Sequence, residues 1–396
     1  MVAGLPAVRM RTVTTFLLAA VVALVSLSLT MLASATALDS GTNADAGIRN
    51  QLIATLVGFV GLGLAASLDY RRTRRLSWVV YGVSLVLLVL VLTPLGHETK
   101  GARRWLFGIQ PSEVAKLSLI LALASYGAQR QNVIQRFWKG LGLGCLIALP
   151  ILALVAAEPD RGTTALLMLV TMMILLLAGV RWLFVVPPVI IGVAALGAMI
   201  WVSPMAQSRW KAWWDPDSHK ATTGMQVRKS LQAFAVGGIE GQGLAAGAQK
   251  FRVPEVHTDF ILPAVGEDLG LFGSLGVLAA YSIILICGVM IAFRAADLHG
   301  LLLAAGITFL ICAQTTVNIG VVTALLPNKG MPLPFVSRGG SSIAILLTLV
   351  GILLSVARQA GSAEESDAAS EHSGRSRSQS RNRNNPFANP DFAPVD

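Results

Sequence analysis

Long apolar runs recur along almost the whole chain, and they constrain its fold more than any single motif. A helix needs about 20 such residues to cross the roughly 30 Å hydrocarbon core of a membrane, where only helices or closed barrels satisfy the backbone. The runs cover residues 14–33, 52–68, 77–95, 114–126, 141–157, 163–180, 183–202, 271–293, 301–326 and 343–357. We therefore predict an all-α polytopic membrane protein with about ten transmembrane helices.

The composition favours the same class of protein. Hydrophobic residues make up 54% of the 396-residue chain and charged residues 13%, whereas soluble domains carry about 25% charged residues. The net charge of +10 would suit nucleic acid, but no nucleic-acid-binding motif accompanies the basic residues. The three cysteines lie in apolar runs without ligand spacing and are expected to be core residues. We expect no nucleic-acid partner and no organic cofactor.

Basic residues mark alternate loops, as the positive-inside rule requires when both termini are cytoplasmic. The sequence then divides into a cytoplasmic amino terminus (1–13), a membrane domain (14–357) and a polar tail (358–396) that we predict to be disordered and cytoplasmic. A large outer loop (205–258) separates the seventh and eighth helices. The inward basic residues are Arg9, Arg11, Arg71, Arg72, Arg74, Arg75, Arg130, Arg136, Lys139, Arg181 and Arg294.

Two outer segments carry more cations than this topology needs. One holds Lys100, Arg103 and Arg104, and the other is the loop 205–258, which includes Arg209. Such an excess suggests an anionic ligand on the outer face. The alternative is that long loops cross the membrane regardless of charge.

Ionisable residues gather where the long loop meets the eighth apolar run. Glu255, His257, Asp259, Glu267 and Asp268 all lie in the segment VPEVHTDFILPAVGEDLG. Each such group near hydrocarbon depth costs roughly 2.5–3.5 kcal/mol, so a cluster of them indicates a working site.

Shorter motifs lie beside the fourth and sixth runs and in the long loop. In QPSEVAK, Ser112 is a candidate N-cap, and Glu113 and Lys116 stand one turn apart, so that Lys116 either pairs with Glu113 or meets an anion. Asp160 in EPDRGT is expected to cap the next helix. In the long loop we expect a short amphipathic helix with an apolar face of Val227, Leu231 and Phe234.

The last loop, LPNKGMPLPFVSRGGSS, is rich in proline and glycine between two spans. Non-helical backbone at membrane depth must be buried in protein or line a wet cavity. Lys329 and Arg338 would then face that cavity, and Ser341 would donate a hydrogen bond to a ligand. Gln314 and Asn318 in the preceding span serve either as contacts between helices or as cavity wall.

Taken together, these segments resemble the SEDS family of polytopic peptidoglycan glycosyltransferases, which includes FtsW and RodA. The resemblance runs from about residue 14 to residue 358, through GARRW, QPSEVAK, EPDRGT, GMQVRKSLQAFAVGGIEGQGL, PEVHTDFILPAVGEDLG and PNKGMPLPFVSRGGSS in the same order. The lysine of PNKG and the phenylalanine after LP are closer to the division branch, FtsW. Arg338 departs from the tyrosine that is usual in the family.

The resemblance implies polymerisation of lipid II, a lipid pyrophosphoryl disaccharide, in the bacterial inner membrane at the division septum. Asp259 occupies the essential aspartate position and is the expected base. Arg103, Arg104, Lys116 and Lys329 are expected to bind the pyrophosphate. Further substrate contacts are expected from Glu255, His257, Glu267 and Ser341. A divalent cation, Mg²⁺ or Mn²⁺, is a further expectation.

The same resemblance implies partners and leaves alternatives. The partners are lipid II, undecaprenyl-linked glycan, a class B penicillin-binding protein transpeptidase, other divisome proteins and membrane lipid. The alternatives are a lipid II flippase, an elongation-type polymerase like RodA, and a scaffold that only recruits a transpeptidase.

Overall fold

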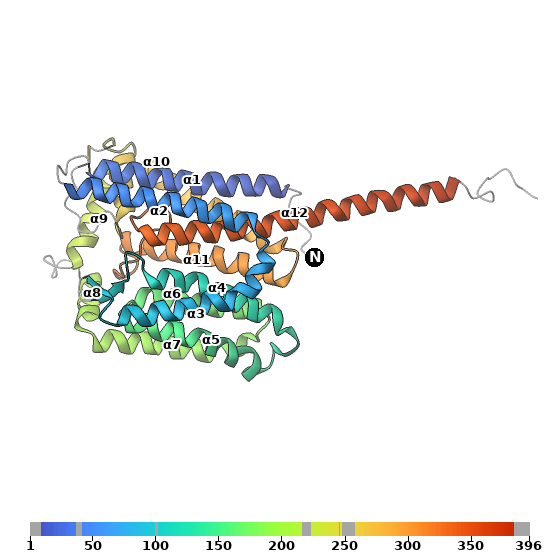
Figure 1. Cartoon of the computed structure of the whole chain (residues 1–396). Coiled ribbons are helices and arrows are strands. Elements are labelled where there is room, and N and C mark those ends of the chain that lie inside the picture. Colours follow the sequence, from blue (N-terminus) through green and yellow to red (C-terminus); the bar gives the residue numbers. More distant parts are fainter. Residues whose placement is uncertain are drawn as a thin grey trace, which may run out of the picture.

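The chain forms one bundle of long helices that lie roughly side by side (Figure 1). The computed structural model describes residues 9–36, 42–99, 102–215, 223–244, 246–247 and 258–383. The α-helices are α1 (Met10–Thr36), α2 (Thr42–Ser67), α3 (Thr73–Leu92), α4 (Pro111–Gln129), α5 (Leu143–Ala157), α6 (Arg161–Leu177), α7 (Trp182–Val202), α8 (Pro204–Trp214), α9 (Thr223–Gly237), α10 (Ile261–Phe293), α11 (Leu298–Val322) and α12 (Gly340–Arg383). Shorter elements are the strands β1 (His97–Thr99) and β2 (Ala102–Trp105) and the single turns η1 (Tyr70–Arg72), η2 (Gln131–Val133) and η3 (Phe137–Gly142).

Every predicted span coincides with one helix, which confirms the all-α polytopic fold. Within the described ranges, seven helical segments are long and apolar enough to cross a membrane, and α6 and part of α7 are shorter apolar helices. The remaining span is α4, which is buried over most of its length. It packs against α3, α6 and α11 at the centre of the bundle.

Outer helices expose apolar side chains where a soluble protein would expose polar ones. On α2, Leu56, Val57, Val60 and Leu64 are all more than half exposed, while the opposite side of the helix packs along α12. An apolar surface of this extent fits contact with lipid.

The bundle has two distinct ends (Figure 1). At the end we name the loop end lie α8, α9, the β1–β2 hairpin and the α11–α12 connection. The other, named the terminal end, holds the start of α1, the turn η1 and the α10–α11 connection, and α12 projects from it. Which end faces the cytoplasm stays a prediction.

Helix α10 begins earlier than the sequence predicted. It starts at Ile261 rather than at residue 271, so Glu267 and Asp268 are helical and buried. The helix is kinked at Gly270, whose φ of 67° and ψ of −159° are accessible mainly to glycine. The apolar pattern did not predict the first part of α10 because Glu267 and Asp268 are charged. The partners that allow these two residues to be buried are distant in sequence.

The kink of α10 is covered by the glycine-rich segment that follows α9. The amides of Gln242 and Gly243 donate to the carbonyls of Glu267 (2.9 Å) and Asp268 (3.0 Å). A Cβ atom on Gly270 would lie 2.4 Å from the carbonyl oxygen of Ile239. The segment therefore lies directly on the α10 backbone, as glycine permits.

The predicted amphipathic helix is α9, but its buried face differs from the expected one. Val227, Ser230 and Ala233 are buried, whereas Leu231 is 45% exposed. The Ser230 hydroxyl donates to the carbonyl of Val322 at 2.6 Å. Leu231 was wrongly assigned because α9 packs against α10 and α11 through small residues spaced three apart.

Two further local predictions differ from the structure. The N-cap of α4 is Gln110, with Pro111 in the first turn, rather than Ser112. Helix α12 continues to Arg383, past residue 358, where we expected disorder to begin. The polar segment 363–383 contains no proline to interrupt the helix.

Candidate functional site

Asp259 lies at the loop end, immediately before α10 and against the α11–α12 connection. Its backbone carbonyl accepts a hydrogen bond from Asn318 Nδ2 (2.9 Å), which also donates to the carbonyl of Met331 (2.7 Å). A Cβ atom at Gly330, where φ is +58°, would lie 3.1 Å from Asp259 Oδ2. Asn318 thus joins two segments, and the Asp259 carboxylate rests on the Gly330 backbone.

The connection from α11 to α12 is itself packed within the protein. Met331, Leu333, Phe335 and Val336 are buried, and Gln314 Nε2 donates to the Pro332 carbonyl at 2.8 Å. Irregular backbone here is therefore covered, as membrane depth requires. Gln314 and Asn318 hold this connection to α11, and Gln314 also accepts a hydrogen bond from Lys116 of α4.

Arg209 of α8 lies within electrostatic range of the Asp259 carboxylate and of two other guanidinium groups, those of Arg104 and Arg161. Burial lowers the pKa of Arg209 in α8, the negative charge of Asp259 opposes that shift, and the like charges of Arg104 and Arg161 add to it. Arg161 Nε is buried without a hydrogen-bond partner among the described residues. We call Arg104, Arg161, Arg209 and Asp259 the loop-end cluster.

Only part of the loop-end cluster was predicted from the sequence. Arg209 was among the surplus outer cations but was not a predicted site residue, and Arg161 was not predicted. The excess of cations in the long loop was the signal that pointed to Arg209. The positions of Arg161 and Arg209 depend on how α6 and α8 pack, and no local sequence motif predicts that packing.

Arg104 also shapes the turn between α5 and α6. Its Nε and Nη2 donate to the carbonyls of Glu158 (3.1 Å) and Pro159 (2.6 Å). Asp160 caps α6 as predicted, because its carboxylate accepts from the amide (3.2 Å) and the hydroxyl (3.0 Å) of Thr163. The Arg104 side chain is thereby held near the cluster by the backbone of this turn.

Glu158 is a buried acid that the sequence analysis did not single out. The residue has 0% exposure, and neither carboxyl oxygen has a hydrogen-bond partner within the described part of the chain. Burial raises the pKa of Glu158 to about 8, with Asp160 adding to the shift and Arg104 opposing it. At neutral pH its carboxyl therefore holds a proton in most molecules.

Lys116 lies away from solvent in an ion pair. Its Nζ is 2.8 Å from Glu113 Oε1 and donates to Gln314 Oε1 at 3.1 Å. Both charged side chains are almost fully buried. This geometry favours the pairing alternative over direct binding of an anion by Lys116.

The other predicted cations have different surroundings. Arg103 faces Glu98 across the β1–β2 hairpin, with Nε 3.7 Å from Glu98 Oε2 and both side chains about half exposed. Lys329 is exposed beside Gly330, and partial desolvation lowers its pKa. Lys329 is therefore placed to meet a ligand near Asp259, whereas Arg103 has an intramolecular partner.

Two of the remaining predicted substrate contacts, Ser341 and Glu267, lie in the described part of the chain and have intramolecular contacts. Ser341 Oγ accepts a hydrogen bond from the amide of Gln110 at 3.2 Å. Glu267 is buried, and a Cβ at Gly247 would lie 2.6 Å from its Cδ. Glu255 and His257 lie outside the described residues.

Arg338, which departs from the usual family residue, contacts α2. A Cβ atom on Gly47 would lie 2.9 Å from Arg338 Nη2, so the guanidinium packs closely over this glycine. The neighbouring amide of Gly339 donates to Gln51 Oε1 at 3.2 Å. The departure is thus accommodated by a small residue on the facing helix.

Metal ligands do not come together in the part of the chain that the structure describes. No group of at least three His, Cys, Asp or Glu side chains there is arranged to hold a metal ion.

Comparison with known proteins extends the resemblance across the chain. The family model described as cell cycle protein, covering FtsW, RodA and SpoVE, matches residues 11–362. A probable peptidoglycan glycosyltransferase FtsW of Trichlorobacter lovleyi is 38% identical over 86% of this chain and 92% of its own length. Stage V sporulation protein E of Bacillus subtilis is 34% identical over 78% of this chain and 86% of its own length.

Solved structures share the fold. One chain, described under structural coordination of polymerization and crosslinking by a peptidoglycan synthase complex, matches with a TM-score of 0.74 and 28% identity, covering 87% of this chain and 97% of its own. Thermus thermophilus RodA matches with a TM-score of 0.64 and 28% identity, covering 86% and 95% respectively. This chain therefore belongs to the FtsW, RodA and SpoVE family of cell cycle proteins.

Proposed function

We propose that this protein is a peptidoglycan glycosyltransferase of the division type, which polymerises lipid II into glycan strands. The observation that carries the proposal is the loop-end cluster, where Arg209 interacts electrostatically with the Asp259 carboxylate and with the guanidinium groups of Arg104 and Arg161. Glycosyl transfer from a lipid pyrophosphate needs a base at one position and positive charge at another. Relatives named peptidoglycan glycosyltransferase FtsW support the same activity.

In the proposed reaction, a sugar hydroxyl of one lipid-linked disaccharide attacks the anomeric carbon of the growing strand. A new glycosidic C–O bond forms while the bond from the anomeric carbon to the pyrophosphate oxygen breaks. The Asp259 carboxylate accepts the hydroxyl proton, and the pyrophosphate leaves with the bonding electrons. A divalent cation, Mg²⁺ or Mn²⁺, stays a prediction.

Positive charge stabilises the leaving pyrophosphate in this proposal. Arg209 and Arg161 are available for this role, and exposed Lys329 lies beside the Gly330 backbone that contacts Asp259. Guanidinium groups bind phosphate oxygens in a bidentate geometry, which also fixes the orientation of the donor. Arg104 contributes charge while its donors hold the α5–α6 turn.

The decisive test is Asp259→Asn, which keeps the size of the side chain but removes its basicity. Strand synthesis by the purified variant with lipid II and its transpeptidase partner should fall roughly 10²–10⁴-fold. Glycan strands separated on a gel give the rate. Glu240→Gln is the matched control, since Glu240 is an exposed acid at the loop end.

The same variant separates a polymerase from a lipid II flippase. A flippase performs no proton transfer, so Asp259→Asn would leave lipid II translocation largely intact. Strand synthesis by Asp259→Asn at the wild-type rate, at equal protein level, would refute the assignment of the base and favour transport.

The division role, the septal position in the bacterial inner membrane and the partners are parts of this proposal. The expected partners are a class B penicillin-binding protein transpeptidase and other divisome proteins. The likeness to a chain from a peptidoglycan synthase complex supports a polymerase that works beside a crosslinking enzyme.

A further inference from the structure

A polar cavity of about 630 Å³ opens at the terminal end, far from the loop-end cluster. Its size falls within the range of roughly 300–1,000 Å³ that is typical of small-molecule sites. It lies where η1 and the start of α3 meet the start of α11 and the end of α4. The lining residues are Arg71, Arg74, Arg75, Trp78, Gln129, Asp297 and His299, which we call the arginine pocket.

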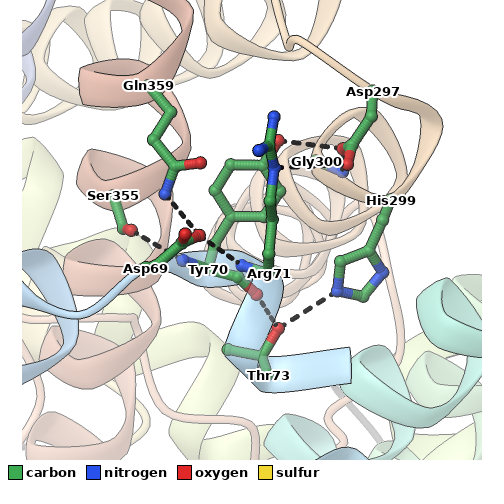
Figure 2. Close-up of polar contacts among 9 residues, drawn as sticks. All are labelled: Asp69, Tyr70, Arg71, Thr73, Asp297, His299, Gly300, Ser355 and Gln359. Carbon is green, nitrogen blue, oxygen red and sulfur yellow. Dashed lines mark hydrogen bonds and ion pairs between the residues drawn. The ribbon is translucent and has the colours of Figure 1, made fainter. Parts of the chain in front are cut away.

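Asp297, the one acidic residue that lines the arginine pocket, already accepts two hydrogen bonds and forms an ion pair (Figure 2). Its Oδ1 accepts from the Tyr70 hydroxyl at 2.9 Å and from the amide of Gly300 at 2.8 Å. Arg71 Nε lies 3.9 Å from Oδ2. The carboxylate therefore caps α11 and balances one arginine only.

The wall beside Asp297 is held in place by contacts among α3, α11 and α12 (Figure 2). Thr73 Oγ1 lies 3.1 Å from His299 Nε2, and His299 is 3% exposed. The Tyr70 amide donates to Ser355 Oγ at 3.1 Å, and Gln359 Nε2 donates to Asp69 Oδ1 at 2.6 Å. The start of α3 is thus fixed before any ligand arrives.

Two arginines of the pocket, Arg74 and Arg75, have no counter-ion within the described part of the chain. Among the described residues, neither Arg74 nor Arg75 forms a side-chain ion pair, and both are exposed. Together with Arg71 they give three guanidinium groups against the single carboxylate of Asp297. Guanidinium pairs of this kind match the oxygens of a phosphate group.

The pocket continues into an apolar surface along α3. Val79, Val83 and Val86 follow Arg75 at helical spacing and are 61%, 52% and 58% exposed. Trp78, 45% exposed, lies at the junction, where tryptophan favours the boundary between membrane and water. A ligand with a phosphate head and apolar tails fits this surface, whereas a soluble anion would leave the apolar strip unused.

We propose that the arginine pocket binds the phosphate head group of an anionic phospholipid, with its acyl chains along Val79, Val83 and Val86. The lipid belongs to the leaflet at the terminal end. Basic pockets between transmembrane helices are known to select anionic head groups by this combination of charge and apolar contact. This site is independent of the loop-end cluster and of lipid II polymerisation.

Native mass spectrometry of the whole protein in detergent tests the proposal with two probes, dioleoylphosphatidylglycerol and dioleoylphosphatidylcholine. The wild type should retain phosphatidylglycerol in preference to phosphatidylcholine. Arg74→Gln combined with Arg75→Gln should weaken phosphatidylglycerol binding roughly 30-fold, because each arginine near a membrane surface raises the affinity for an anionic lipid roughly fivefold. Phosphatidylcholine binding should not change.

A matched double variant removes the same charge outside the pocket. Arg72→Gln combined with Arg136→Gln changes two exposed arginines that do not line the cavity. It should bind phosphatidylglycerol as the wild type does, and Arg74→Lys combined with Arg75→Lys should retain intermediate affinity. Size-exclusion profiles establish that each variant is folded.

Three results would overturn the proposal. The first is equal retention of the two lipids by the wild type, which needs no variant to be folded. Another is an equal loss of phosphatidylglycerol in both glutamine pairs, which would indicate general attraction to charge. The last is displacement of phosphatidylglycerol by millimolar inorganic phosphate, which would assign the pocket to a soluble anion.

Discussion

At the scale of single residues, the pairing of Lys116 with Glu113 determines how a loss of activity in a Lys116 variant is to be interpreted. Both charges are buried beside α11, where Gln314 is the further partner of Lys116. Removing one member of a buried pair leaves an uncompensated charge, which typically costs about 3–5 kcal/mol. Loss of activity in a Lys116 variant can therefore arise from lost stability alone.

We predict that Lys116→Met destabilises the protein by about 3–5 kcal/mol and that adding Glu113→Gln restores much of the loss. Thermal unfolding in detergent gives both values. Arg103→Met is the matched control, because its half-exposed pair with Glu98 is worth about 0–1 kcal/mol. A Lys116→Met protein that is fully stable yet inactive would instead place Lys116 on the substrate.

Glu158 gives a second prediction at this scale, through pH. The folded state raises the pKa of its carboxyl from 4.5 to about 8, so between those values the folded protein holds a proton that the unfolded chain has lost. The free energy of unfolding therefore decreases as pH rises through this window. The contribution of the Glu158 carboxyl to the free energy of unfolding is fully present only below about pH 4.5.

Glu158→Gln should reduce this dependence on pH, since the amide is neutral throughout. Unfolding temperatures measured at pH 5.5 and pH 8 in detergent should differ less in the variant than in the wild type. Glu240→Gln, which changes an exposed acid near the same end, should keep the wild-type difference. An unchanged difference in Glu158→Gln would show that Glu158 is ionised in the folded protein.

At the scale of elements, the kink of α10 joins that helix to the glycine segment after α9. Gly270 combines a positive φ with a close backbone approach, so alanine there meets both strain of roughly 1–3 kcal/mol and a clash. We predict that Gly270→Ala lowers the unfolding temperature and exposes the 238–247 segment to limited proteolysis.

Gly276→Ala is the control for that change, since it lies in the same helix and a Cβ there meets no atom within 4 Å. Alanine favours helix over glycine by up to about 1 kcal/mol, so Gly276→Ala should be neutral or slightly stabilising. Equal stability of the two variants would mean that the segment does not rest on Gly270.

The helices were predictable from the sequence to the extent that lipid contact determines them. Apolar runs identified every span, because a surface that faces lipid must be apolar. The first part of α10 was missed because Glu267 and Asp268 are covered by distant segments, including the Ser34 hydroxyl, which donates to Asp268 Oδ2 at 2.8 Å. No local pattern records such a partner.

The candidate site was predictable only in part, for a related reason. Asp259 and Lys329 follow from recognisable motifs. The structure places the Asp259 carboxylate against Gly330, the residue that follows Lys329. Arg209 interacts with the Asp259 carboxylate from α8 and with Arg161 at the start of α6. Their roles depend on packing between those helices, and sequence spacing carries no record of it.

At the scale of the whole molecule, the two ends differ in the chemistry they present. The loop end carries the loop-end cluster and the helices α8 and α9, whereas the terminal end carries the arginine pocket and the projecting α12 (Figure 1). A polymerase of lipid-linked sugars that builds an external wall needs its site outside the cell. The proposed function therefore requires the loop end to face outward.

Cysteine labelling tests this orientation in cells. In a variant with Cys145, Cys287 and Cys312 replaced by alanine, Glu240→Cys lies at the loop end and Gln135→Cys near the terminal end, and both positions are exposed. The basic residues around η1 and η3 favour a cytoplasmic terminal end under the positive-inside rule. A membrane-impermeant maleimide should thus label Glu240→Cys in intact cells and Gln135→Cys only after permeabilisation. Labelling of both positions from outside, or the reverse pattern, would contradict the orientation, and with it the placement of Asp259 where lipid II is polymerised.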